Sequence, residues 1–214
     1  MYLMKFIPFF ILSILAMQTM AQHTHQAPVA KKVEQSDDYF GNQIEDPYRW
    51  LEDDNAAETT EWVDAENRFT QHYLNHITFR GKVKNDLTKM WNYEKYSSPH
   101  KEGEYYLFYK NNGLQNQAVL YIQKGLQGTP SVLIDPNTLN NTGTASLNSV
   151  ELSKNQKYCA YSVSQAGSDW QDIYIIDIAS KKTISDVINY SKFSGIAWKG
   201  DEGFYYSGYD KPAS

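Results

Sequence analysis

Two patterns of apolar residues divide the chain. Between Asp46 and about Trp91, apolar side chains recur every three or four residues, which is the spacing of one face of an α-helix. After Asn92 they fall instead in short runs rich in Tyr, Val and Ile, residue types that favour β-strands. The pattern therefore predicts an N-terminal helical segment over residues 38–92 and a β-rich region over residues 93–214.

The helical segment is expected to contain one long helix with an apolar face. The face is formed by Trp62, Ala65, Phe69, His72, Tyr73 and Ile77. This spacing predicts that the face is buried. Asp54 or Asn55 is expected to cap the helix, because such side chains accept hydrogen bonds from the free N–H groups of a first turn. Capping and helix entry also explain the acidic residues Glu52 and Asp53 more simply than a pair of catalytic carboxylates does.

The β-rich region is predicted to form strands that repeat along the chain. The strands cover residues 105–109, 118–122, 132–134, 158–163, 173–178 and 204–206. An apolar residue, a polar turn and an aromatic strand recur at 151–161 and 197–207, with a weaker copy at 102–106. Repeats of roughly 40–50 residues in β-rich sequence are typical of four-stranded propeller blades. The fold is therefore predicted to be mainly β, a partial β-propeller of about two blades and the start of a third.

Charge and cysteine content exclude several classes of protein. The net charge is −5, the isoelectric point is about 5.5 and the Lys and Arg residues are scattered, so we expect neither a nucleic-acid partner nor an anionic membrane surface. A single cysteine, Cys159, permits no intrachain disulfide and no cysteine-based zinc or iron–sulfur site. Since Cys159 lies in a predicted strand, we expect it to be a small buried apolar residue.

The first residues have the pattern of a signal peptide. Lys5 precedes an apolar stretch over residues 6–16, and small and polar residues follow up to Ala21. The apolar stretch is shorter than the roughly 20 residues that span a bilayer. We therefore expect a signal peptide over residues 1–21, cleavage near Ala21, and an exported protein, periplasmic or extracellular, that begins with a disordered linker over residues 22–37.

Six runs of residues resemble one protein family in order and spacing. They are Tyr39-Phe40-Gly41, Asp46 to Asp53 (DPYRWLED), Gly113 to Gln117 (GLQNQ), Leu133 to Asn137 (LIDPN), Gly167 to Trp170 (GSDW) and Lys192 to Ser194 (KFS). In these runs the chain resembles the amino-terminal portion of the prolyl oligopeptidases. The resemblance implies a serine endopeptidase that cleaves short peptides after proline, in which a seven-bladed propeller caps an α/β-hydrolase domain.

The parts of a serine triad are not found in this sequence. It contains no Gly-x-Ser-x-Gly elbow, and its five histidines lie at or before His100, too early for the Ser, Asp, His order of such domains. We therefore expect the α/β-hydrolase domain to be absent, the chain to hold no catalytic residue, and the 214 residues to be inactive alone. No cofactor is expected, because acyl transfer by a serine triad uses side chains and backbone donors.

The resemblance implies a substrate-binding role for Asp169 and Phe193. Asp169 matches an aspartate that holds an arginine of the hydrolase domain, and that arginine hydrogen-bonds the substrate backbone. Phe193 matches a phenylalanine that lines an apolar pocket for a residue upstream of the proline. Read without the family, Asp169 is a turn residue and Phe193 a core residue. Without the hydrolase domain, Asp169 is expected to be a solvated loop residue.

Two alternatives to this interpretation remain in the sequence. His72 and His76 lie four residues apart on a predicted helix, but Tyr73 stands where the zincin pattern needs Glu, so we predict no metal site. The chain is also consistent with a free-standing propeller-type binding or interaction module without enzymatic activity. Exposed blade edges argue against that module, because unpaired strands tend to aggregate.

Overall fold

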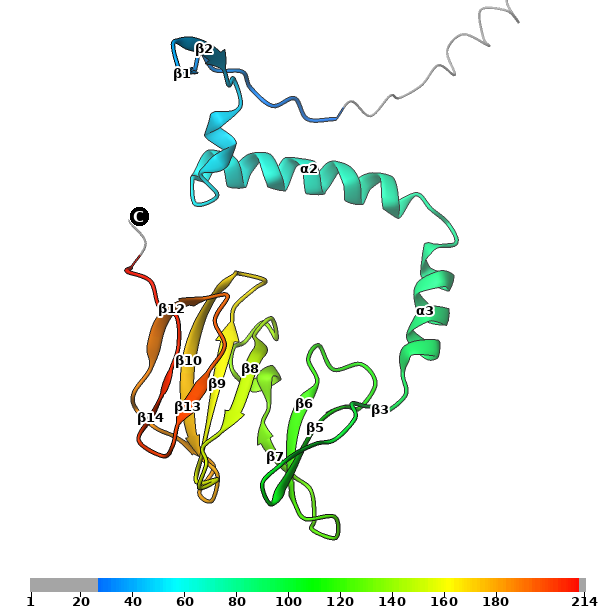
Figure 1. Cartoon of the computed structure of the whole chain (residues 1–214). Helices are drawn as coiled ribbons and strands as arrows, with labels where there is room; N and C mark the ends of the chain where they lie inside the picture. The colour runs from blue at the N-terminus through cyan, green and yellow to red at the C-terminus, as the bar shows by residue number, and fades with distance from the viewer. Residues whose placement is uncertain (1–26, 212–214) are drawn as a thin grey trace, which may run out of the picture. The chain divides into compact units, whose positions relative to one another are not determined.

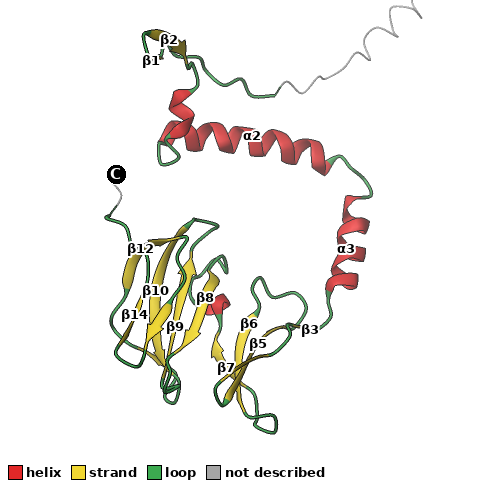
Figure 2. Ribbon diagram, in the orientation of Figure 1, coloured by secondary structure: helices red, strands yellow, loops and turns green. Residues whose placement is uncertain are grey.

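The computed structural model describes residues 27–211, which belong to two compact units, 1–83 and 84–214 (Figure 1). We describe each unit by itself. The longer helices lie between residues 49 and 91, and the chain that follows forms strands joined by turns and one short helix (Figure 2). The predicted signal peptide, residues 1–21, lies outside the described residues.

The first unit begins with a hairpin that the sequence analysis did not predict. Strands β1 (Ser36–Tyr39) and β2 (Asn42–Glu45) pair antiparallel. The turn between them is Phe40-Gly41, and both residues have positive φ, 57° and 83°. Such a turn matches the twist of a two-stranded ribbon. The family-like run Tyr39-Phe40-Gly41 is therefore the tip of a hairpin.

One arginine ties this hairpin to the short 3-10 helix η1 (Arg49–Glu52). The Nε of Arg49 donates to the Oδ2 of Asp46 at 2.6 Å, and its Nη2 donates to Asp37 in β1. Hydrogen bonds to Asp46 and then to Asp37 raise the pKa of Arg49 above its ordinary value, because both carboxylates stabilise the guanidinium. The DPYRWLED run thus holds together the start of the unit.

The stretch before the hairpin makes specific contacts, which corrects the expectation of a disordered linker over residues 22–37. Residues 22–26 lie outside the described part of the chain. Beyond them, the backbone N–H of Val33 donates to the carbonyl of Pro47 at 3.1 Å, and the backbone carbonyl of Lys31 accepts from the indole Nε1 of Trp50 at 3.1 Å. The backbone of this stretch is bound by groups that lie downstream of it in the chain.

Helix α2 (Ala57–Asn75) starts later than predicted and is less covered than predicted. Its N-cap is Ala56, without a side-chain hydrogen bond, so the predicted caps Asp54 and Asn55 are wrong. Asn55 instead donates its side-chain amide to Asp54 at 2.9 Å. The predicted burial of the apolar face is also wrong within the described residues: Tyr73 is 69% exposed, and Thr59 is the one buried residue of the helix.

Within the first unit, Trp50 contacts α2 near the start of the helix. Trp50 packs edge-on against Trp62, with ring centroids 6.4 Å apart, and its carbonyl accepts from the hydroxyl of Thr59 at 3.1 Å. These contacts reach only the first two turns of the helix. Helix α3 (Arg80–Trp91) follows α2 and spans the boundary between the two units.

The second unit consists of two antiparallel sheets and a further hairpin. The first sheet contains β3 (Lys95–Tyr96), β4 (His100–Glu102), β5 (Tyr105–Asn111), β6 (Val119–Lys124) and β7 (Ser131–Ile134). After the short helix η2 (Pro136–Thr138), the second sheet contains β8 (Ser146–Leu152), β9 (Tyr158–Ser164), β10 (Trp170–Asp177), β11 (Lys182–Thr183) and β12 (Ile188–Lys192). The hairpin is β13 (Ala197–Lys199) with β14 (Gly203–Tyr205).

This arrangement confirms the predicted partial propeller. The three copies of the sequence repeat fall on β5, β9 and β14, each of which pairs with the strand before it across a short turn. The described strands therefore form two blades and begin a third (Figure 1). All strand pairs among residues 27–211 are antiparallel, which differs from the mostly parallel sheet of an α/β domain. Strands β3, β4, β8, β11, β12 and β13 were not predicted, because each is short or lacks a long apolar run.

Strand β9 carries the core of this unit because it is buried on both faces. Residues on one face, such as Cys159 and Tyr161, pack with side chains of the first sheet, and Ala160 on the other face packs with Ile173 and Ile196. The larger cluster is formed by Leu107, Leu120, Ile122, Leu133, Ile134, Ala145, Leu152, Cys159, Tyr161, Val163, Ile176 and Ile178. The prediction that Cys159 is buried is confirmed.

Equivalent hydrogen bonds join the turns of neighbouring blades, one between the first and second blades and one between the second and third. The N–H of Glu104, in the turn of the first blade, donates to the Oε1 of Gln156 in the second at 2.8 Å. The N–H of Asn155 in the second blade then donates to the Oδ1 of Asp201 in the third at 2.7 Å. Each turn thus offers a side-chain acceptor to the backbone of the turn before it.

We predict that Leu120→Ala lowers the free energy of unfolding by about 2–5 kcal/mol, because Leu120 is 1% exposed at the junction of the two blades and its loss leaves a cavity. Leu126, which is 72% exposed, supplies a matched control, and Leu126→Ala is expected to change stability by less than about 0.5 kcal/mol. Urea unfolding followed by tryptophan emission measures both. Equal effects of the two substitutions would contradict the proposed core.

A second prediction concerns the thiol of Cys159. Burial raises the pKa of this thiol to about 12, so at pH 8 it should react with a disulfide reagent only when the protein unfolds. Because an unfolded thiol ionises near pH 8.5 and the folded one does not, the free energy of unfolding should fall more steeply between pH 9 and 11 than in Cys159→Ala. Rapid labelling of the native protein, or equal pH slopes, would show that the thiol is accessible.

Candidate functional site

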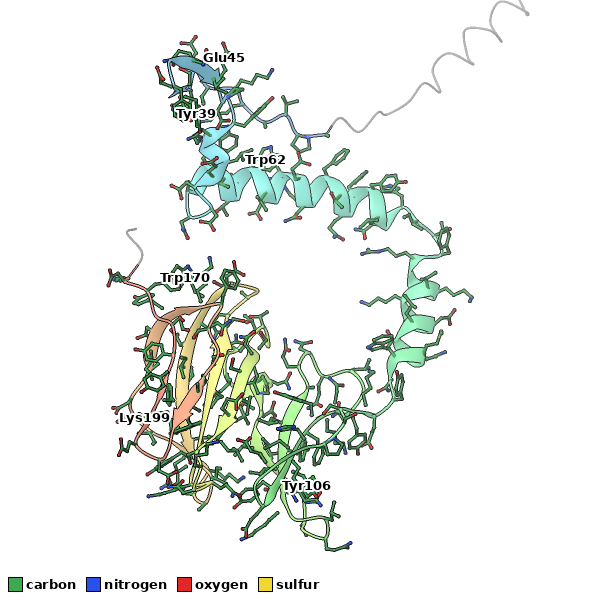
Figure 3. All side chains as sticks on the ribbon, viewed as in Figure 1. Tyr39, Glu45, Trp62, Tyr106, Trp170 and Lys199 are labelled. Atoms are coloured by element: carbon green, nitrogen blue, oxygen red, sulfur yellow. The ribbon has the colours of Figure 1, made fainter. Side chains whose placement is uncertain are left out.

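The structure places Asp169 and Phe193 at the same end of the second sheet. Asp169 immediately precedes β10, and Phe193 immediately follows β12. These strands pair antiparallel, with Trp170 opposite Lys192, so the start of one meets the end of the other. Figure 3 shows Trp170 at this end of the sheet. Two residues that are distant in sequence are thereby neighbours.

Lys192 contacts both of them and the tryptophan between. Its Nζ lies 3.5 Å from the Oδ2 of Asp169. The same ammonium lies 5.2 Å from the ring centroid of Trp170 and 5.1 Å from that of Phe193, within the range of cation–π attraction. One cation therefore links a carboxylate to two aromatic rings. We call Asp169, Trp170, Lys192 and Phe193 the rim cluster.

Phe193 is held in the open rather than in the core. The residue is 75% exposed, and its φ of 50° lies in the left-handed region that residues other than glycine rarely adopt. The next residue, Ser194, is anchored: its hydroxyl accepts from the N–H of Ser207 at 2.7 Å, and its carbonyl accepts from Ser149 at 3.4 Å. The interpretation of Phe193 as a core residue is thus wrong.

Asp169 lies in a tight loop, and 60% of its side-chain surface is exposed. The loop turns at Ala166 and Gly167, both with positive φ, and the N–H of Ser168 donates back to Gln165 at 2.9 Å. Asp169 is therefore a solvent-exposed loop residue, as expected. The pairing of Asp169 with Lys192 was not expected, because the sequence does not show that β12 returns to this loop.

Trp170 is fixed by aromatic neighbours. Tyr190 and Tyr209 both meet its ring edge-on, with centroids 6.4 and 5.7 Å away. The N–H of Tyr209 donates to the carbonyl of Tyr190 at 3.0 Å, so the two tyrosines are held together. Next to them is a hollow of about 680 Å³ lined by Asn189, Tyr206, Gly208, Tyr209 and Asp210. Tyr209 thus lines the hollow and packs against Trp170 of the rim cluster.

Two other family-like runs bind one another and have a structural role. The N–H of Gln117 donates to the side-chain oxygen of Asn137 at 2.9 Å, and the amide of Asn137 donates back to the carbonyl of Gln117 at 3.0 Å. Asp135 also accepts from the Asn137 amide, at 2.9 Å. The GLQNQ and LIDPN runs therefore close one end of the first blade.

The structure offers little support for other kinds of site. The rings of His72 and His76 are 4.5 Å apart, and the Nδ1 of His76 contacts the carbonyl of His72 at 2.7 Å. No group of three or more His, Cys, Asp or Glu side chains that could hold a metal ion occurs among residues 27–211. Within the same residues, no helix has the length and apolar character needed to cross a membrane.

Sequence reasoning missed two members of the rim cluster. Lys192 and Trp170 both stand in the family-like runs, next to the residues singled out, but neither was assigned a role. Their proximity depends on the register of β10 against β12, which includes a bulge between Gln171 and Ile173. The conspicuous Gly-Ser-Asp-Trp and Lys-Phe-Ser runs were the available signal.

Known proteins resemble this chain over most of its length. Residues 28–214 match the model of the prolyl oligopeptidase N-terminal β-propeller domain. The prolyl endopeptidases of Elizabethkingia miricola and Elizabethkingia meningoseptica are 53% and 52% identical over 185 residues. In both comparisons the match covers 86% of this chain and 26% of the relative. The chain thus spans about a quarter of the length of the curated relatives it matches.

Solved structures show the same fold. A structure from a study of two prolyl endopeptidases aligns with a TM-score of 0.78 and 28% identity, over 88% of this chain and 28% of that one. Prolyl oligopeptidase B of Galerina marginata, bound to a 25-residue macrocyclization substrate, aligns with a TM-score of 0.72 and 28% identity, over 88% and 30% of the chains. The chain therefore belongs to the prolyl oligopeptidase family of peptidases, in which it corresponds to part of the N-terminal β-propeller domain.

Proposed function

We propose that this chain is the N-terminal part of an exported serine endopeptidase that cleaves short peptides after proline, and that its catalytic triad lies in a domain outside the 214 residues. The observation that carries the proposal is the 53% identity to a prolyl endopeptidase. The match covers 26% of the length of that relative. Identity at this level over 185 residues supports a shared reaction as well as a shared fold. The serine mechanism itself is inferred from the family.

In this proposal Asp169 and Phe193 contribute to substrate binding. Asp169 has one oxygen near Lys192 and an exposed side chain, so it can accept hydrogen bonds from an arginine of the catalytic domain as well. A guanidinium held in this way presents its remaining N–H groups in a fixed direction, which suits a peptide carbonyl. Phe193 offers an exposed ring to an apolar residue upstream of the proline.

Helix α3 supports the presence of a further domain. Val83, Leu87, Met90 and Trp91 are all exposed and recur at helical spacing, so they form an apolar stripe along the helix. Contiguous apolar surface of this kind usually marks an interface. We propose that the catalytic domain of the same polypeptide covers this stripe.

Export is proposed from the leader pattern alone. The mature protein is expected to begin at Gln22, after removal of residues 1–21, in the periplasm or the medium. Mass spectrometry of the protein from its native host checks this. A mature protein that retains Met1 would contradict cleavage.

We predict that the purified 214-residue chain does not hydrolyse a chromogenic Gly-Pro amide, whereas the polypeptide expressed from the complete gene does. The reason is that the groups of a serine triad are missing from the chain. A serine-directed inhibitor should abolish the activity of the longer polypeptide. Turnover by the 214-residue chain that the same inhibitor removes would overturn the proposal.

We predict that Asp169→Asn in the complete enzyme lowers kcat/KM about 10-fold, because a neutral amide holds a guanidinium less firmly than a carboxylate does. Glu202→Gln is the matched control, since Glu202 lies exposed in the turn between β13 and β14 and should leave kcat/KM unchanged. Steady-state hydrolysis of the same amide measures both. Unchanged kinetics in Asp169→Asn would exclude the proposed role of Asp169.

A further inference from the structure

We infer that Lys192 is a positioning residue that holds Phe193 in the orientation in which the enzyme meets an apolar residue of its substrate, and so contributes to substrate selectivity. This inference rests on the proposed function. It is carried by the three contacts of the Lys192 ammonium: the carboxylate of Asp169 at 3.5 Å and the rings of Trp170 and Phe193 at 5.2 and 5.1 Å.

The backbone at Phe193 needs support from its neighbours. A left-handed conformation is unfavourable for a phenylalanine, and it persists only where the surrounding structure imposes it. The residue, being 75% exposed, supplies little packing of its own. The support comes from the two adjacent residues, Lys192 on one side and Ser194 on the other.

Ser194 anchors the backbone but not the ring. Its hydrogen bonds to Ser207 and Ser149 fix the chain after Phe193. The Lys192 ammonium, by contrast, contacts the aromatic ring of Phe193 itself. That ammonium is itself held by Asp169 and by Trp170, whose ring is fixed between Tyr190 and Tyr209. The ring of Phe193 is thus connected to the rigid sheet through Lys192.

Loss of the Lys192 ammonium is expected to change KM and not kcat. Loss of the ammonium frees the ring of Phe193, which weakens contact with the substrate equally in the ground state and the transition state, so KM should rise while kcat stays the same. It does not remove Asp169, which remains available to a second cation. A role of Lys192 in general folding would instead lower the amount of active enzyme and affect all substrates alike.

The test uses the complete enzyme with Lys192→Met, Lys192→Arg and Phe193→Ala, and Lys182→Met as a control on an exposed lysine of β11. Methionine keeps the apolar stem without the charge, and arginine keeps both charge and stacking. Two blocked peptide amides are compared that differ only in having phenylalanine or glycine upstream of the proline. Both kcat and KM are measured for each, and active enzyme is counted by titration with a serine-directed inhibitor.

We expect Lys192→Met to raise KM roughly 5-fold for the phenylalanine peptide and less than about 2-fold for the glycine peptide, with kcat unchanged. Lys192→Arg should restore KM to within about 2-fold of the parent, and Lys182→Met should match the parent. A fall in kcat on both peptides, or a Lys192→Met variant as selective as the parent, would overturn the inference.

Phe193→Ala separates this inference from the proposed function. If Phe193→Ala loses the selectivity and Lys192→Met keeps it, Phe193 binds substrate but does not depend on Lys192. If Phe193→Ala keeps the selectivity as well, the proposed role of Phe193 itself is wrong.

Discussion

The burial of β9 on both faces is the constraint on which the described propeller depends. One face of the strand joins the large cluster shared with the first blade, and the other packs against Ile173, Ile196 and the hairpin that begins the third. A blade with two apolar faces is stable only between neighbours, because each face left in water costs roughly 25 cal/mol for every Å² of apolar surface. The blades therefore form a continuous stack.

The rim cluster is a product of this stack. Strand β10 pairs with β9 over residues 171–177, and β12 pairs with β10, so the position of the buried strand sets the position of both outer strands. Lys192 and Phe193, at the end of β12, therefore lie beside the loop that contains Asp169. Polar and aromatic groups of this kind need no burial of their own, because the scaffold beneath them is rigid, and functional residues are commonly placed on such loops.

Both units leave apolar surface uncovered in a way that fits membership of a larger peptidase. Helix α2 has one buried residue and exposes Val63 and Tyr73, and α3 carries an exposed apolar stripe. The second unit also exposes several aromatic residues, among them Phe193 at the rim and Tyr205 in the last hairpin. The curated relatives are about four times as long as the matched region.

The sequence by itself determined the fold class, the repeat and the family, because these depend on local spacing: alternating aromatic strands, polar turns at recurring intervals, and runs such as Gly-Ser-Asp-Trp. It also determined the burial of Cys159. It did not determine the cap of α2, the exposure of its apolar face or the contacts of residues 27–37, since these depend on which groups come near. The link between Asp169 and Phe193 through Lys192 was decided by the tertiary structure alone, because it requires the register of two strands about twenty residues apart in the chain.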